Sequence, residues 1–213
     1  MAAEPVVVVH GLWCGPWIMA ILARRLAGCG FVPRCFGYPT VRRSPAENGR
    51  ALAGFVAALP GERFHVVGHS LGGLVVLHWL AAGPDPRLGR VVLMGTPFRG
   101  AVVARRLLHL PGGRGLLGRS VEAGLLGGAP APPAGVEIGV LAGDMGIGLG
   151  TLLGGAGRPS DGVVAVAETE LPGAAARRVL HLNHTGLLLS KRAAAEVCHF
   201  LRHGRFGGSA DRG

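Results

Sequence analysis

Ser70 is the residue whose surrounding sequence most clearly indicates covalent chemistry. It is the central residue of Gly68-His69-Ser70-Leu71-Gly72, which fits the G-x-S-x-G pattern. That pattern holds a serine hydroxyl on a sharp turn between a strand and a helix. The apolar run "FHVV" precedes Ser70, and the apolar spacing that follows it is helical. The sequence therefore predicts a strand before Ser70 and a helix after it. We therefore interpret Ser70 as a nucleophile, against the alternative of a serine in a glycine-rich turn.

A serine hydroxyl needs a base within hydrogen-bond reach, and His184 is the first candidate. The base needs a carboxylate that fixes its tautomer. In the stretch "RRVLHLNHTGLLLS", His184 follows the last predicted strand and precedes the last predicted helix. His181 would lie in the strand itself, where a partly buried sheet residue is the simpler interpretation, and it is the fallback.

Asp144 and Asp161 are the two candidates for the acid. Asp144 ends "GVLAGD", directly after a predicted strand, and Asp161 begins "DGVVAV", where valines would anchor a loop. Position along the chain does not separate them. Glu168 and Glu170 are further candidates, which we expect to be solvated.

An acyl-transfer site also needs two converging N–H groups that stabilise an oxyanion. The turn geometry assigns one to Leu71. The other should come from the end of the first predicted strand, in "VVVVHGLWCGPW", where His10-Gly11 would direct the Leu12 N–H, in preference to that of Trp13, toward the serine.

Strand and helix patterns alternate along the whole chain, which predicts an α/β protein with a mostly parallel sheet and helices on both faces. The six expected strands lie near 6–9, 31–36, 64–68, 90–94, 136–141 and 177–182. The expected helices lie near 16–27, 45–59, 71–82, 100–108 and 186–203. Ser44-x-x-Glu47 is a capping-box pattern at the start of the second helix.

Length favours one domain over residues 1–213. Two stretches rich in glycine, proline and leucine interrupt the alternation, at 111–135 and 143–160. They are interpreted either as a lid or acyl-binding wall beside a pocket, or as unconstrained surface excursions.

The formal charge of +10 raises the question of a nucleic-acid or membrane partner. Of 22 basic residues 21 are arginine, scattered along the chain without interleaved aromatic residues, so a bias in composition is the favoured explanation and nucleic acid is not an expected partner. Loose peripheral contact with an anionic membrane stays an open alternative.

Cysteine spacing and hydropathy give expectations about the compartment. The four cysteines form no C-x-x-C pair and no metal-ligand spacing with histidine, so reduced structural thiols are expected, with Cys14 the most sensitive to thiol reagents. No apolar run could span a bilayer, and "PVVVV" lacks the features of a signal peptide, so the expected location is cytoplasmic.

Taken in order, five motifs resemble the α/β-hydrolase superfamily, and within it small bacterial serine esterases and lipases of the minimal-lipase kind. They are "VVVVHGLW", "VVGHSLGGLVVL", "GTPFRGA", "PSDGVVAVAET" and "NHTGLLLS". In that family the acid precedes a short hydrophobic run, which implies Asp161 rather than Asp144. The resemblance also implies a fold that lacks the two leading strands of larger members, and catalysis without metal or organic cofactor.

The function implied is ester cleavage through an acyl-serine intermediate, with Ser70, Asp161 and His184 as the triad and apolar acyl esters or lipids as small-molecule substrates. Two alternatives stay open. The same triad would serve an acyltransferase or a thioesterase, and the fold could carry a non-catalytic binding module.

Overall fold

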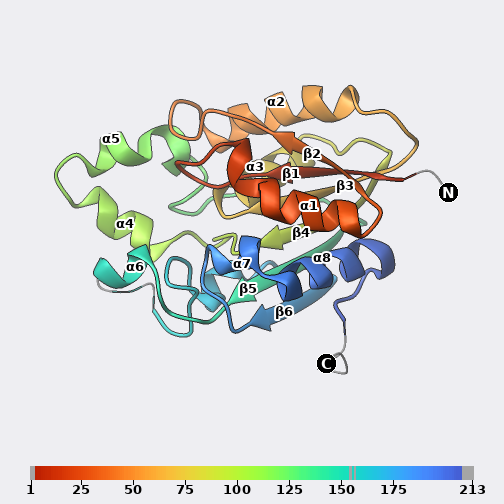
Figure 1. Ribbon diagram of the computed structural model, residues 1–213. Coiled ribbons are helices and arrows are strands. Elements are labelled where there is room, and N and C mark those ends of the chain that lie inside the picture. The colour runs from red at the N-terminus through yellow and green to blue at the C-terminus, as the bar shows by residue number, and fades with distance from the viewer. Residues whose placement is uncertain (1–2, 154, 156, 208–213) are drawn as a thin grey trace.

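The computed structural model describes residues 3–153, 155 and 157–207. Its centre is one sheet of six strands, all parallel, in the order β2-β1-β3-β4-β5-β6 (Figure 1). The strands are β1 (Pro5–Val9), β2 (Val32–Phe36), β3 (Phe64–His69), β4 (Leu88–Met94), β5 (Glu137–Gly143) and β6 (Ala176–Leu180). The strand order turns back beside β1 and β3, and ligands of open α/β sheets bind at such switch points.

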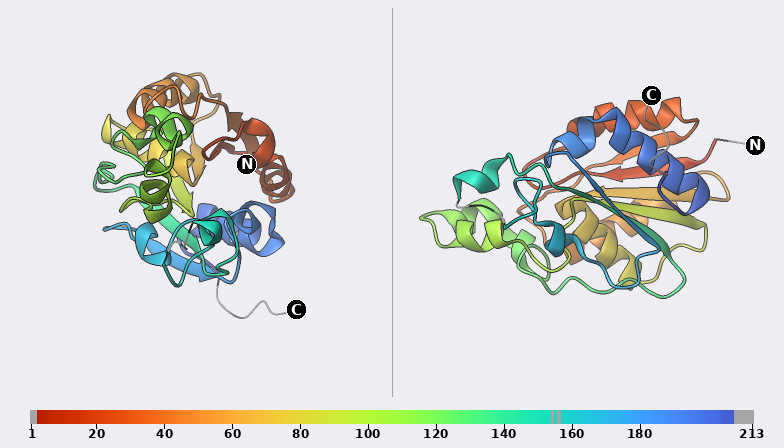
Figure 2. Two further views of the ribbon diagram at one scale, coloured as in Figure 1. Left: turned by 90° about the vertical axis from the view of Figure 1, so that its left-hand side faces the viewer. Right: turned by 90° about the horizontal axis from the view of Figure 1, so that it is seen from below.

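Helices cover both faces of this sheet, as the two views in Figure 2 show. One face carries α1 (Ala20–Gly28), α7 (Gly186–Leu189) and α8 (Lys191–His203), and the other carries α2 (Pro45–Ala57) and α3 (Leu71–Ala81). A parallel sheet buried on both faces needs apolar residues on both sides of each strand, and all five residues of β1 are buried.

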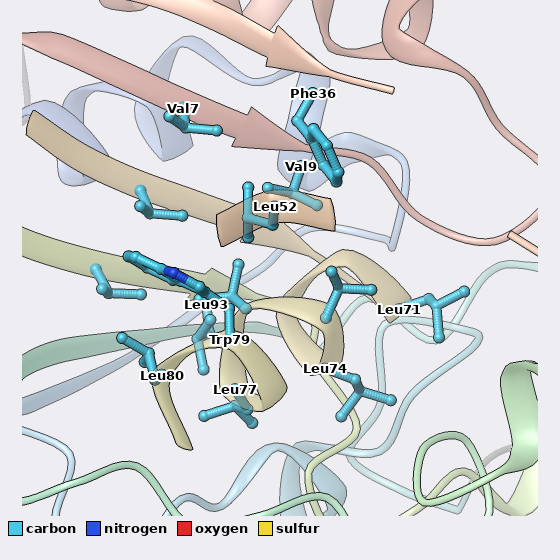
Figure 3. Packing of buried hydrophobic residues seen from close by; sticks show 14 of the residues in the cluster. Val7, Val9, Phe36, Leu52, Leu71, Leu74, Leu77, Trp79, Leu80 and Leu93 are labelled. Atoms are coloured by element: carbon cyan, nitrogen blue, oxygen red, sulfur yellow. The ribbon is translucent and has the colours of Figure 1, made fainter. Parts of the chain in front are cut away.

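The larger core lies between the sheet and the α2–α3 layer (Figure 3). Val7, Val9 and Leu93 from the strands face Leu52 of α2 and Trp79 of α3, and all five are at most 1% exposed. α3 is apolar on nearly every side because α2 covers its outer surface. The helix that follows Ser70 is therefore fixed by packing over most of its length.

Short helices lie beyond the carboxyl ends of the strands, at the left of Figure 1. They are α4 (Val102–Leu108), α5 (Gly113–Leu117) and α6 (Leu149–Leu152). The described residues also form 3-10 turns, η1 (Pro16–Met19), η2 (Gly118–Val121) and η3 (Val166–Thr169).

The expected fold class is confirmed, since all six strands and their order along the chain match the prediction. Two details differ. The first expected helix begins as a 3-10 turn, and the last is split at Ser190, whose backbone is extended and whose hydroxyl accepts N–H bonds from Arg192 and Ala193 at the start of α8. The excursion at 111–135 contains α5 and η2, and that at 143–160 contains α6, with residues 154 and 156 outside the described part.

The expectation of four reduced thiols is wrong. Cys29, at the end of α1, forms a disulfide with Cys198 of α8, 169 residues away along the chain. Cys14 and Cys35 are free, and partial burial raises the pKa of both thiols. Cysteine spacing does not indicate this bond, because the helix pair α1–α8, rather than a local motif, brings the two residues together.

Across the residues that the structure describes, no helix combines the length and hydropathy needed to cross a bilayer.

Candidate active site

Ser70 lies at the turn between β3 and α3, with φ 55° and ψ −124°. A positive φ costs free energy for a residue with a Cβ, and it persists only where the surrounding structure imposes it. Here the Ser70 N–H donates to Met94 O over 2.9 Å, and the N–H of Gly73 donates to Ser70 O over 3.0 Å. The structure therefore holds Ser70 in the strained conformation typical of a nucleophile elbow.

Three glycines make this turn sterically feasible. A Cβ at Gly68 would lie 2.7 Å from the Cα of Gly73, and one at Gly72 would lie 2.3 Å from Val9 O. A Cβ at Gly73 would lie 2.0 Å from the hydroxyl of Thr96. These close approaches let the first turn of α3 pack directly against the ends of β1 and β4.

Asp161 and His184 form a buried pair. Asp161 Oδ2 lies 2.6 Å from His184 Nδ1, with side chains 1% and 14% exposed. The other carboxylate oxygen accepts the N–H groups of Val163, over 2.9 Å, and Val164, over 2.7 Å. The His184 N–H also donates to Asp161 O over 2.8 Å. Because a carboxylate only accepts, Nδ1 carries the proton and Nε2 is left as the basic nitrogen.

Two neighbours position this pair. Gly95 has φ 54°, and a Cβ there would lie 3.1 Å from Asp161 Oδ2 and from His184 Nδ1. His69, buried beside Ser70, donates from Nε2 to His184 O over 3.2 Å. Burial, and then the neighbouring His184, lower the pKa of His69 well below 6.5. A neutral His69 therefore links the serine turn to the histidine loop.

The backbone N–H groups of Leu12 and Leu71 differ from that of Trp13 in whether they have a hydrogen-bond acceptor. Leu71 is the first residue of α3, where N–H groups have no acceptor within the helix. Neither Leu12 nor Leu71 donates its N–H to any described residue outside regular secondary structure. The Trp13 N–H instead donates to the hydroxyl of Thr40 over 3.3 Å.

Tyr38 fixes the turn that carries Leu12. Its hydroxyl donates to His10 O over 2.6 Å, and its ring stacks on that of His10 with centroids 4.4 Å apart. His10 is fully buried, and burial lowers its pKa. The next residue is Gly11, where a Cβ would lie 3.1 Å from Ser70 Cβ. A side chain at Gly11 would therefore crowd the serine.

Ser70 and His184 both open into one apolar cavity of about 210 Å³. Its apolar wall consists of Leu12, Trp13, Ile18, Pro97, Ala101, Val103, Ala104, Leu107, Leu117, Leu125, Val163, Val164 and Leu188. Leu117 and Leu125 come from the excursion at 111–135, which supports its interpretation as a binding wall. Of the described residues in the excursion at 143–160, none lines this cavity.

The remaining candidates are placed elsewhere. Asp144 pairs with His181 over 2.9 Å at an exposed position. Glu170 is half-buried and pairs with Arg99 over 3.1 Å. Glu168 is buried and accepts the N–H groups of Val102, over 2.7 Å, and Ala165, over 2.8 Å. Burial raises the pKa of Glu168. The expectation that Glu168 is solvated is wrong, because its carboxylate caps α4.

One contact of the expected triad is not made. Within the described part of the chain, the Ser70 hydroxyl forms no hydrogen bond, although it faces the same cavity as His184. Such bonds are often long or misaligned without substrate and tighten in the complex. Tyr38, Gly95 and the role of His69 were missed from the sequence, since their contacts depend on packing between distant segments.

Solved structures of esterases and lipases share this fold. The mature lipase BlEst2 of Bacillus licheniformis superposes with a TM-score of 0.72 at 17% identity, over 95% of this chain and 92% of that one. The metagenomic carboxyl esterase MGS0156 gives a TM-score of 0.66 at 20% identity, over 96% of this chain and 74% of that one.

Curated relatives match shorter segments. A 2-hydroxy-6-oxo-6-phenylhexa-2,4-dienoate hydrolase of Comamonas testosteroni is 44% identical over 54 residues, which is 25% of this chain and 18% of that protein. A 2-hydroxy-6-oxononadienedioate/2-hydroxy-6-oxononatrienedioate hydrolase of Paraburkholderia xenovorans is 36% identical over 105 residues, which is 44% of this chain and 36% of that protein. The model of the Alpha/beta hydrolase family matches residues 6–145, and the chain belongs to that family.

Proposed function

We propose that this protein is a serine hydrolase that cleaves carboxylic esters with apolar acyl groups. The observation that carries the proposal is the buried Asp161–His184 pair, which opens into the same apolar cavity as the strained Ser70. A base held in one tautomer beside a serine on a sharp turn is the arrangement that acyl transfer requires.

The reaction follows from these positions. Ser70 Oγ attacks the ester carbonyl while His184 Nε2 takes its proton, and the oxyanion is bound by the N–H groups of Leu12 and Leu71. His184 then gives the proton to the departing alkoxide, which leaves as the alcohol. Water, deprotonated by His184, attacks the acyl-serine, and the acid and free Ser70 are released. Asp161 keeps the imidazole oriented and stabilises its cationic form.

The substrate class follows from the cavity wall. Its volume of about 210 Å³ is below the ~300–1,000 Å³ of sites for drug-sized ligands, which favours short to medium acyl chains. No arginine or lysine is among the described residues that line it. Neutral esters therefore fit better than anionic dienoates of the kind named for the curated relatives.

The test uses p-nitrophenyl esters from acetate to palmitate with the wild type and Ser70→Ala. We expect turnover that peaks at intermediate chain length and falls by at least roughly a thousandfold in the variant. Circular dichroism and the melting temperature serve as folding controls, and a fluorophosphonate probe should label the wild type alone. Unchanged turnover in a folded Ser70→Ala variant would contradict the proposal, and a maximum at acetate would contradict the acyl preference.

Acyl transfer and thioester hydrolysis use the same intermediate and differ in the acceptor or the leaving group. Product analysis with water and an alcohol in competition separates transfer from hydrolysis. A protein that binds esters without turnover, and that the probe does not label, would instead be a binding module.

A further inference from the structure

The surface formed by η1, α1, α7 and the start of α8 exposes large apolar side chains. Trp17 is 71% exposed, Ile21 is 43% exposed and Leu189 is 41% exposed. Trp17 and Ile21 are one helical turn apart, and the Arg25 guanidinium donates to Leu189 O, which joins α1 to α7. Figure 1 shows α1, α7 and α8 side by side. We call this surface, defined by Trp17, Ile21, Arg24, Leu189 and Arg192, the α1–α7 face.

Cations accompany these apolar side chains, and the segments that form the face contain no acidic residue. Arg24, Lys191 and Arg192 are exposed, and Arg25 is partly buried. Neither residues 5–46 nor residues 171–195 contain an aspartate or glutamate. The scattered arginines of the sequence therefore produce, in the fold, one face that is both apolar and positive.

The α1–α7 face adjoins the wall of the cavity. Ile18, next to Trp17, and Leu188, next to Leu189, both line the cavity wall. Whatever covers Trp17 and Leu189 thus lies close to the wall of the cavity.

We propose that the α1–α7 face docks on the surface of an anionic lipid bilayer. Tryptophan is favoured at membrane–water interfaces, where its ring is buried and its N–H stays near the headgroups. Arginine and lysine beside it are attracted to anionic lipids. A second copy of this chain would present the same positive face, and two such faces would repel each other. Docking places the cavity wall at Ile18 and Leu188 near the lipid.

The experiment measures co-sedimentation with phosphatidylcholine vesicles, with and without phosphatidylglycerol. The variants are Trp17→Ser/Ile21→Ser, Arg24→Gln/Arg192→Gln, and Val179→Ser as a matched control, since Val179 is 40% exposed on β6. We expect the wild type to bind phosphatidylglycerol vesicles with an affinity that falls as salt rises. The affinity of Trp17→Ser/Ile21→Ser for these vesicles should be reduced by at least roughly tenfold. Val179→Ser should bind like the wild type.

Ser70→Ala separates this proposal from the proposed function, because docking does not require the serine. Ser70→Ala should bind vesicles like the wild type, and a wild type that binds vesicles but has no esterase activity would overturn the function alone. The docking proposal would be overturned if the wild type did not bind vesicles, or if Val179→Ser lost as much vesicle affinity as Trp17→Ser/Ile21→Ser. The docking proposal would also be overturned if the wild type formed a dimer and bound no vesicles, and if Trp17→Ser/Ile21→Ser converted that dimer to a monomer.

Discussion

Two aspartate–histidine pairs lie after the carboxyl ends of β5 and β6, and burial distinguishes them. Asp161 and His184 are 1% and 14% exposed, whereas Asp144 and His181 are 35% and 75% exposed. A hydrogen bond in a low-dielectric site is stronger than one screened by water. Only the Asp161–His184 pair reaches the cavity of Ser70, so we expect the acid function there.

Asparagine substitutions separate the two aspartates. Asp161→Asn should lower kcat by roughly three to four orders of magnitude, because the amide favours the wrong histidine tautomer. Asp144→Asn should change kcat less than about twofold, since an exposed pair contributes little. Ester hydrolysis by both variants, with their melting temperatures, checks this. Equal losses would show that the acid is not Asp161 alone.

Gly95→Ala tests how tightly the pair is enclosed. An alanine at φ 54° costs about 1–2 kcal/mol, and its Cβ would crowd both Asp161 and His184. We expect lower stability and a roughly tenfold to hundredfold fall in kcat, because small displacements of reacting groups are costly.

Gly54→Ala is the matched control for Gly95→Ala. Gly54 lies within α2 with open space around it, so alanine there should stabilise the protein by about 0.5–1 kcal/mol with unchanged kcat. Urea unfolding and ester turnover measure both variants. Full activity in Gly95→Ala would show that the histidine loop can move to accommodate a methyl group.

At the scale of elements, Glu47 joins the start of α2 to the cavity wall. It accepts the Ser44 N–H over 2.8 Å as part of a capping box, and it contacts the Arg119 guanidinium of η2 over 2.7 Å. η2 directly follows α5, whose Leu117 lines the cavity. Glu47 therefore caps α2 and also holds η2, the segment directly after the cavity-lining Leu117.

This contact predicts a dependence of stability on pH. The Ser44 N–H, and then Arg119, lower the pKa of Glu47 from 4.5 to about 2. Between these values the unfolded chain binds more protons, so the stabilisation is present above pH 4.5 and is lost as pH falls toward 2. Glu47→Gln should thus be less stable than the wild type at pH 6 and should approach it near pH 2. Urea midpoints across this range measure the difference, and a constant difference would contradict the assignment.

The elements with a strong local pattern could be predicted, and those defined by contacts between segments could not. Ser44-x-x-Glu47 marked the start of α2, and the change from strand to helix spacing marked Ser70. The break at Ser190 was not predicted, since the apolar spacing runs through it and only the hydroxyl cap reveals it. Glu168 was misjudged because its partners, Val102 and Ala165, come from two different segments.

At the scale of the whole molecule, the disulfide Cys29–Cys198 joins α1 to α8, two of the helices that contribute to the α1–α7 face. It closes a loop of 169 residues, and cross-links that close long loops restrict the unfolded chain most.

Reduction of this disulfide should lower the melting temperature by roughly 5 to 15 °C. The melting temperature of Cys29→Ser should be low and independent of dithiothreitol, and that of Cys35→Ser, at a free and exposed cysteine, should match the wild type in both conditions. Scanning calorimetry with and without dithiothreitol measures this. A wild-type melting temperature that dithiothreitol leaves unchanged would rule out a stabilising cross-link.

The same disulfide makes most of the chain a covalent ring. Ser70, Asp161 and His184 all lie between Cys29 and Cys198, and so does the cavity wall at 111–135. A protease that cuts once within that wall would therefore release no fragment, and the two pieces would migrate together in electrophoresis until a reductant separated them. Ser70 on one piece and Asp161 and His184 on the other would stay tethered after the backbone is broken.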